Sequence, residues 1–218
     1  MMLHIAQCLE PGDLEAVREV AAEVDFADGR STAGSAAERV KYNEQAEADQ
    51  AAGALRLVEQ RLRASDLFAR TARPAAFPRL LLSRYGPGMR YGSHVDQALI
   101  ADQRTDLSFT LFLSEPDQYD GGELVIEDTS GERAWKLPAG DLLLYPSTFL
   151  HRVNEVTRGE RLAVVGWVTS RIRDPGEREL LFDLELAVRE EWQSRGDSEQ
   201  LARLSRIRNN LLRRWVDR

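Results

Sequence analysis

The segment from Arg161 to Val168 places the tightest limit on how this chain folds. Strand alternation puts one set of side chains on one face and the other set on the opposite face, and both sets are largely apolar: Ala163, Val165 and Trp167 follow Arg161, while Leu162, Val164 and Val168 oppose them. Because both faces need cover, the segment predicts a strand inside a closed or sandwiched sheet.

Three side chains near this strand form a candidate metal site. His94 and Asp96 stand two positions apart, so in extended backbone both side chains leave the chain on the same face. With His151, they supply two neutral nitrogens and one anionic oxygen, a set typical of non-haem Fe(II) oxygenases. A His-x-Asp pair alone is more often a surface or capping pair, so this prediction depends on its surroundings. Structural zinc is disfavoured because Cys8 is the only cysteine.

Arg161, at the head of the strand, requires an anionic partner if it is buried. The planar guanidinium fits a carboxylate, which leaves either a ligand carboxylate or a strand-end ion pair. The neighbouring metal set favours the ligand. Arg152 and Arg158 are lesser candidates for that role, and the Thr-Arg-Gly sequence at Arg158 indicates a turn that points outward.

Five runs of sequence carry a family resemblance, at positions 84–96, 104–108, 119–124, 140–147 and 157–161. They resemble the bacterial PKHD-type hydroxylases, a prolyl 4-hydroxylase-like branch of the Fe(II)/2-oxoglutarate-dependent dioxygenases. Segments 28–34, 40–45 and 181–184 are also similar, so the resemblance covers nearly the whole chain. Tyr42 departs from the pattern where a second asparagine beside Asn43 is expected, which leaves its effect on the substrate mouth open.

The resemblance implies an α+β fold with a double-stranded β-helix core, of the jelly-roll or cupin-like kind, and flanking N- and C-terminal helices. It implies Fe(II) held by His94, Asp96 and His151, with Arg161 on the 5-carboxylate of 2-oxoglutarate. Tyr85 resembles a strand tyrosine that lines the cosubstrate pocket. Ser108 and Thr110 are further candidates for hydrogen bonds there.

The implied reaction consumes O₂ and 2-oxoglutarate, hydroxylates an unactivated C–H bond, and releases succinate and CO₂. The substrate stays open among amino acids, peptides, protein side chains and small metabolites, and ascorbate stays open as a further cofactor. The alternative is a non-catalytic iron and 2-oxoglutarate sensor in the same barrel. A cupin-like zinc or manganese protein is disfavoured by Arg161, and a halogenating enzyme by the presence of Asp96.

Charge and composition exclude other classes. A net charge of -7 disfavours a nucleic-acid partner. The chain has no apolar run long enough for a membrane span and no signal-peptide pattern at its start. A single cysteine suits a reducing cytoplasm. A homo-oligomer stays open.

Periodicity predicts one domain in three parts: N-terminal helices and a loop (1–77), the dioxygenase core (78–170) and C-terminal helices (171–218). The strands are expected at 79–85, 105–113, 123–127, 141–145, 150–155 and 161–169. We expect Asp13 to cap the first helix, and loops 25–46 and 97–106 to approach the active-site mouth. The last helices should carry an apolar stripe that includes Leu180 and Trp192, in the core or at an interface.

Overall fold

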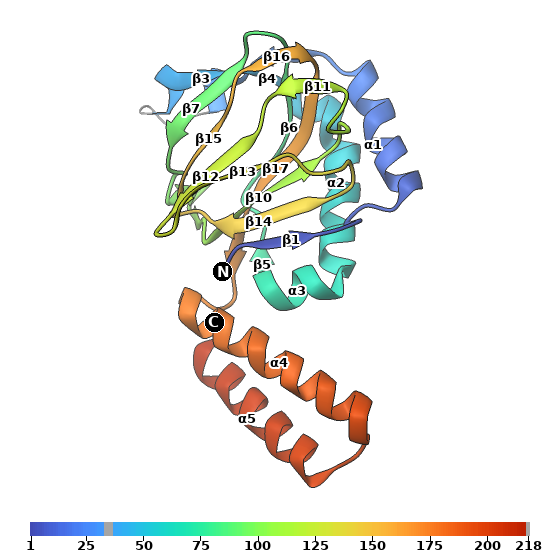
Figure 1. Ribbon diagram of the computed structural model, residues 1–218, viewed down its shortest axis with the longest axis vertical. Helices are drawn as coiled ribbons and strands as arrows, with labels where there is room; N and C mark the ends of the chain where they lie inside the picture. Colours follow the sequence, from blue (N-terminus) through green and yellow to red (C-terminus); the bar gives the residue numbers. More distant parts are fainter. Residues whose placement is uncertain (33–36, 217–218) are drawn as a thin grey trace.

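Two antiparallel sheets face each other at the centre of the structure, a computed structural model that describes residues 1–32 and 37–216 (Figure 1). The larger sheet has the order β1-β14-β10-β17-β6-β4-β2, with β5 also paired to β17, and the smaller has the order β13-β12-β15-β7-β3. This is the predicted α+β double-stranded β-helix, a jelly roll.

The strands of the larger sheet are β1 (Leu3–Ile5), β2 (Phe26–Asp28), β4 (Glu44–Ala46), β5 (Pro74–Ala76), β6 (Leu80–Tyr85), β10 (Leu107–Phe112), β14 (Leu142–Pro146) and β17 (Arg161–Ser170). Those of the smaller sheet are β3 (Lys41–Tyr42), β7 (Arg90–His94), β12 (Leu124–Asp128), β13 (Gly131–Trp135) and β15 (Leu150–Val153). Two short pairs complete the core, β8 (Leu99–Ile100) with β9 (Gln103–Arg104), and β11 (Tyr119–Gly121) with β16 (Val156–Gly159).

The predicted two-sided strands lie in the middle of the larger sheet. β10 pairs with β17 on one side and β14 on the other. Val164 and Val168 of β17 belong to the core under the helices, whereas Val165 and Trp167 line a cavity between the sheets. Each strand thus has a packed outer face and an inner face that is available for chemistry, as the alternation predicted.

Three N-terminal helices cover the outer face of the larger sheet: α1 (Pro11–Glu23), α2 (Ala48–Ala64) and α3 (Asp66–Ala72) (Figure 1). The expectation for Asp13 was wrong, because α1 begins at Pro11 after Glu10, and Asp13 lies inside the first turn. There its carboxylate pairs with Arg61 of α2, with a shortest N–O distance of 2.6 Å. Proline is favourable at the first helical position, so the helix begins at Pro11, before Asp13.

Segment 25–46 is not simply a loop. It contains β2, β3, β4 and two 3₁₀ turns, at Gly29–Thr32 and Glu38–Val40. Most residues of β3 and β4 are polar, so no apolar alternation marks them as strands in the sequence. They are strands because β3 pairs with β7 and β4 pairs with β6. The sequence-similar segment 28–34 lies partly outside the described residues.

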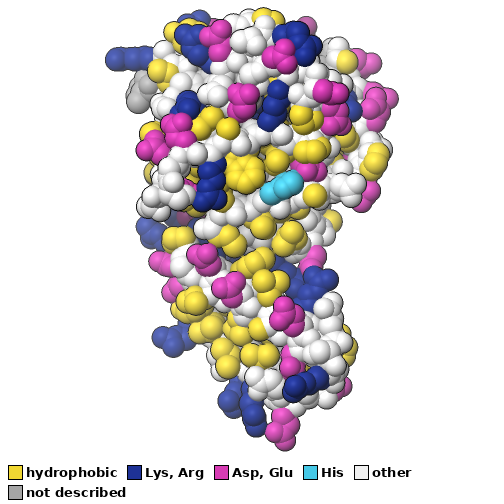
Figure 2. All heavy atoms as spheres, viewed as in Figure 1, with side chains coloured by type: hydrophobic (Ala, Val, Ile, Leu, Met, Phe, Trp, Pro, Cys, Tyr) yellow, Lys and Arg dark blue, Asp and Glu magenta, His cyan; other side chains and the backbone are white. Residues whose placement is uncertain are grey.

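The C-terminal helices α4 (Pro175–Arg195) and α5 (Glu199–Trp215) form a hairpin at one end of the molecule (Figure 1). An ion pair joins the hairpin to α3: a guanidinium nitrogen of Arg73, at the end of α3, lies 3.0 Å from a carboxylate oxygen of Glu185 in α4. Leu180 of the expected stripe does not lie in the core, because it is 60% exposed, and the buried leucine of α4 is Leu181. Trp192 is also exposed, and Figure 2 shows hydrophobic side chains on this part of the surface.

Within the described residues, no helix is both long enough and apolar enough to cross a membrane.

Candidate active site

A cavity opens between the two sheets, and its lining gathers the predicted site residues. His94, Asp96 and His151 contribute from the side of the smaller sheet, and Tyr85, Thr110 and Arg161 from the larger sheet. Sheet pairing brings together residues that are far apart in sequence, since β15 pairs with β7 and places His151 directly opposite His94.

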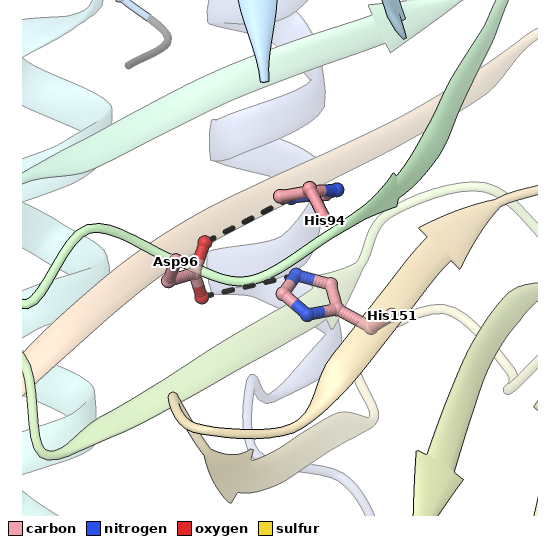
Figure 3. A group of neighbouring side chains, drawn as sticks. All are labelled: His94, Asp96 and His151. Carbon is pink, nitrogen blue, oxygen red and sulfur yellow. Dashed lines mark ion pairs between the residues drawn. The ribbon is translucent and has the colours of Figure 1, made fainter. Parts of the chain in front are cut away.

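The side chains of His94, Asp96 and His151 point toward one another (Figure 3). One Asp96 oxygen lies 3.9 Å from Nε2 of His94, and the other lies 3.8 Å from Nε2 of His151. Candidate ligand atoms of all three lie within 4.8 Å of one another. Two donors that each lie about 2.0–2.2 Å from a shared ion are at most about 4.4 Å apart. The 3.8 and 3.9 Å separations from Asp96 lie within this limit, so the three side chains can close around a metal ion with small movements.

Hydrogen bonds fix which histidine nitrogen is free. Nδ1 of His94 lies 2.9 Å from the carbonyl of Gly92, and Nδ1 of His151 lies 3.0 Å from that of Phe149. A carbonyl only accepts, so each Nδ1 carries the proton and each Nε2 presents its lone pair toward Asp96. Burial, reinforced by the neighbouring His151, lowers the pKa of His94 to about 4 and keeps this ring neutral.

Ser108 holds the carboxylate of Asp96. Its hydroxyl donates to Oδ2 of Asp96 at 2.5 Å and lies 2.7 Å from the hydroxyl of Ser147. Sequence reasoning placed Ser108 in the cavity but assigned it to the cosubstrate, and it did not find Ser147. Alternation of β10 could reveal the inward face, but only the pairing of β10 with β14 brings these hydroxyls together.

Aromatic rings pack the imidazoles from two sides. Tyr91 stacks on His94 with ring centroids 3.6 Å apart, and Tyr145 meets His151 edge-on at 5.2 Å. Burial raises the pKa of Tyr145 well above its ordinary value, so the phenol stays protonated. These contacts restrict the imidazole orientations before any ion is bound.

Arg161 is the most deeply buried charged side chain of the cavity, with 1% exposure. Its Nε and both terminal nitrogens have no hydrogen-bond partner among the described residues. The guanidinium carbon lies 5.2 Å from the ring centre of Tyr85 and 5.4 Å from that of Phe112. A buried guanidinium without an acceptor requires an anion, and a planar carboxylate matches its geometry.

The other arginines considered for this role point elsewhere. Arg158 forms an exposed pair with Asp120, and Arg152 forms a bidentate pair with Glu132. Arg104 contacts Asp106 and the carbonyl of Ser170. The structure therefore leaves Arg161 as the arginine that lines the cavity.

Tyr85 and Thr110 also lie where the sequence placed them. Tyr85 pairs with Arg161 across β6 and β17, and burial raises the pKa of its phenol to about 12. Thr110 is buried on the inner face of β10 and lines the same cavity. Both lie beside the candidate site for the cosubstrate.

Segment 97–106 reaches the cavity, whereas Tyr42 does not. Segment 97–106 contains the β8–β9 hairpin, and Ile100 lines the cavity whereas Gln103 is exposed. Tyr42, where the family pattern is broken, is 47% exposed and lies under Arg90, outside this cavity. Its neighbours Lys41 and Asn43 face inward instead.

Comparison with known proteins agrees with this geometry. The 2OG-Fe(II) oxygenase superfamily model matches residues 80–169, and the PKHD-type hydroxylase C-terminal domain matches residues 176–217. A PKHD-type hydroxylase of Parvibaculum lavamentivorans is 52% identical over 99% of both chains. One of Picosynechococcus sp. is 49% identical over the full length of both.

Solved structures show the same architecture. A Pseudomonas putida prolyl-4-hydroxylase is 26% identical, with a TM-score of 0.54 over 78% of this chain and 92% of that one. A prolyl hydroxylase of Trichoplax adhaerens, in complex with a hypoxia inducible factor peptide fragment, has a TM-score of 0.55 at 16% identity, over 82% of this chain and 86% of that one. The latter likeness concerns the fold.

Fold, cavity and matches together define an Fe(II)- and 2-oxoglutarate-dependent oxygenase. Within that class, the chain belongs to the PKHD-type hydroxylase family. The predicted family is thereby confirmed, and the enzyme is favoured over the sensor that the sequence left open.

Proposed function

We propose that this enzyme hydroxylates an unactivated C–H bond of an amino-acid, peptide or small-metabolite substrate. In this proposal His94, Asp96 and His151 hold Fe(II), and Arg161 holds the far carboxylate of 2-oxoglutarate. Tyr85 and Thr110 line the cosubstrate site. Succinate and CO₂ leave as co-products.

The observation that carries the proposal is the guanidinium of Arg161. It is buried, lacks an acceptor, and shares a cavity with a three-residue donor set. A metal site without a carboxylate ligand would not need a buried arginine. If Arg161 formed a strand-end ion pair, a carboxylate of the protein would lie beside it, and none of the described residues supplies one. A carboxylate ligand that also reaches the metal set accounts for both features at once.

The residues of the chain then have separate tasks. Bound iron supplies the oxidising chemistry with O₂ and 2-oxoglutarate. The carbonyls of Gly92 and Phe149 keep the imidazole Nε2 atoms free for the ion, and Ser108 orients the carboxylate of Asp96. The rings of Tyr85 and Phe112 hold Arg161 in place and exclude water from it.

The test is anaerobic reconstitution with Fe(II) and 2-oxoglutarate, followed by visible absorption of the metal chelate. We expect the band in the wild type, and succinate once O₂ is admitted. Arg161→Met should weaken 2-oxoglutarate binding by about ten- to 100-fold. Arg158→Met, which removes an exposed arginine paired with Asp120, is the matched control and should bind normally. Equal cosubstrate affinity in all three proteins would refute the assignment of Arg161.

Other predictions of the sequence stay predictions: the cytoplasmic location, the absence of a nucleic-acid partner, a homo-oligomer, the use of ascorbate, and the division at 77/78 and 170/171. Succinate formation is also the measurement that separates hydroxylase from sensor.

A further inference from the structure

Three polar side chains face the cavity from one short segment, which runs from β3 at the edge of the smaller sheet to β4 in the larger sheet. Lys41, Asn43 and Gln45 are 4%, 4% and 6% exposed, and all line the cavity. Tyr42 and Glu44, between them, are turned away and are not part of the lining. This alternation makes a polar wall that the proposed iron and cosubstrate sites do not use.

Lys41 is a buried cation without a carboxylate partner. Its ammonium donates to Oγ1 of Thr32 at 2.9 Å, and Thr32 in turn donates to Gln45 at 2.6 Å. Two carboxylates act on its charge from a distance: Asp96, a candidate metal ligand, and Asp28, which is paired with Arg30. No carboxylate of the described residues forms an ion pair with Lys41. Burial lowers the pKa of Lys41 to about 8, which still leaves it charged at neutral pH.

Asn43 lies beside it with an unused amide. Neither Oδ1 nor Nδ2 makes a hydrogen bond of normal geometry within the described residues, although both are buried. Burial raises the pKa of the nearby Tyr85 phenol, and the amide of Asn43 lowers that pKa by a smaller amount. The side chain packs against Gly29, where an added Cβ would lie 2.2 Å from Oδ1. The contact with Gly29 therefore fixes the position of the Asn43 side chain, which cannot turn to find another partner. Buried amides are normally hydrogen-bonded, so we expect a polar group of a ligand to bind here.

Charge balance gives the sign of the missing group. The charged side chains among the described lining residues are Lys41, Asp96 and Arg161. Fe(II) and doubly negative 2-oxoglutarate would cancel each other, as Asp96 and Arg161 do. Lys41 would keep one uncompensated positive charge in a closed site, where an unpaired charge is costly. An anionic group on the substrate would neutralise it.

We propose that the substrate carries a carboxylate that pairs with Lys41, and an adjacent amide that pairs with Asn43. The inference rests on the proposed function, because it concerns the substrate of that same site. Acylated amino acids and peptides with a free or side-chain carboxylate share this chemistry. Lys41 lies on β3 at one edge of the smaller sheet and Asn43 follows it, whereas Arg161 lies on β17 of the larger sheet, so the two carboxylates would be held from different strands of the cavity wall.

The test uses matched probes that differ only in charge. N-acetylamino acids are titrated anaerobically into the Fe(II)–2-oxoglutarate complex, each as the free acid and as the carboxamide. A second arm uses short peptides whose only carboxylate is either C-terminal or on an internal Asp. Changes in the visible chelate band give a dissociation constant without turnover. We expect the best acid to bind about ten- to 100-fold more tightly than its amide.

Variants then assign the effect. Lys41→Met should reduce the acid-to-amide ratio to about twofold or less, while Lys41→Arg should retain a preference for the acid. Lys136→Met is the control, since Lys136 is the only other lysine and contacts Tyr119 outside the cavity. The comparison of acid with amide in the wild type does not depend on any variant folding.

The outcomes separate the two proposals. A chelate band that forms but responds equally to acids and amides, or to none of them, overturns the carboxylate inference and leaves the proposed function intact. An acid preference that survives in Lys41→Met overturns the role of Lys41. A band that never forms overturns both.

Discussion

Arg161→Met should make the protein more stable when no cosubstrate is bound. The wild type holds a guanidinium with 1% exposure and three nitrogens that lack acceptors among the described residues. Methionine keeps an apolar stem of similar reach and removes the charge. It therefore removes a desolvation cost while retaining most of the packing against Tyr85 and Phe112.

The size of the effect follows from two opposing terms. An unpaired buried ion costs several kcal/mol, on the order of 3–5. Ring contacts at 5.2 and 5.4 Å offset about 1–2 kcal/mol of this. A net gain of about 2 kcal/mol corresponds to a rise in Tm of about 4–8 °C for a chain of this size.

2-Oxoglutarate should reduce that difference in stability to less than about 1 kcal/mol. At 100 times its Kd a ligand stabilises the wild type by about 2.7 kcal/mol. A variant with about 100-fold weaker binding gains only about 0.4 kcal/mol at the same concentration. The assay is thermal unfolding with Mn(II) in place of Fe(II), with and without 2-oxoglutarate, so that no turnover occurs.

One outcome of the melting experiment would contradict this role of Arg161. If Arg161→Met melts below the wild type without cosubstrate and shows the same 2-oxoglutarate shift, the guanidinium has a structural partner and another group binds the carboxylate. Arg158→Met, changed at an exposed ion pair, should alter neither the Tm nor the shift appreciably.

Three further variants test other parts of the structure. Asp96→Ala should abolish succinate formation and change the Tm of the metal-free protein little; early melting with full succinate production would make Asp96 structural. Lys41→Met should raise the free energy of unfolding by about 2–3 kcal/mol at pH 7, since burial lowers the Lys41 pKa from 10.5 to about 8 and protonation opposes folding below that range. Urea titrations should show this gain vanish as pH rises above 10.5, where the lysine is neutral in both states; a gain independent of pH would argue against a charge effect. Gly166→Ala should cost about 1–3 kcal/mol in urea unfolding, because its Cβ would lie 2.6 Å from the rigid ring of Phe109, whereas Gly53→Ala, with open space at that position, should be neutral or stabilising.

The strands with clear apolar alternation were predictable, and those without it were not. β17 and β10 carry their two faces in the sequence, so their sheet positions and inward residues followed from periodicity. β7 did not, although it presents His94, because Arg90 to Ser93 are polar or lack a side chain. Its strand conformation comes from pairing with β15 and β3.

The same distinction applies to the helices. Residues 51–62 of α2 show a stripe that the structure buries. In α4 the buried leucine is Leu181, not Leu180, because Leu181 shares the covered face of the helix with Arg178 and Glu185. Arg178 donates to the carbonyls of Ile172 and Arg173, and Glu185 pairs with Arg73. In a helix that buries few side chains, the spacing of apolar residues does not show which face packs against the rest of the protein.

The sequence alone was enough to name the candidate donor set: two histidines, a carboxylate two residues from the first, and an arginine at the head of a two-sided strand. Those identities depend on local spacing and on the bonding preferences of each side chain. Only the tertiary structure decided how the groups are held and what else shares their cavity. Ser108 reaches Asp96, and Lys41 and Asn43 turn inward, because strands distant in sequence pair across two sheets. Such long-range pairing positions polar side chains whose own sequence carries no periodic signal.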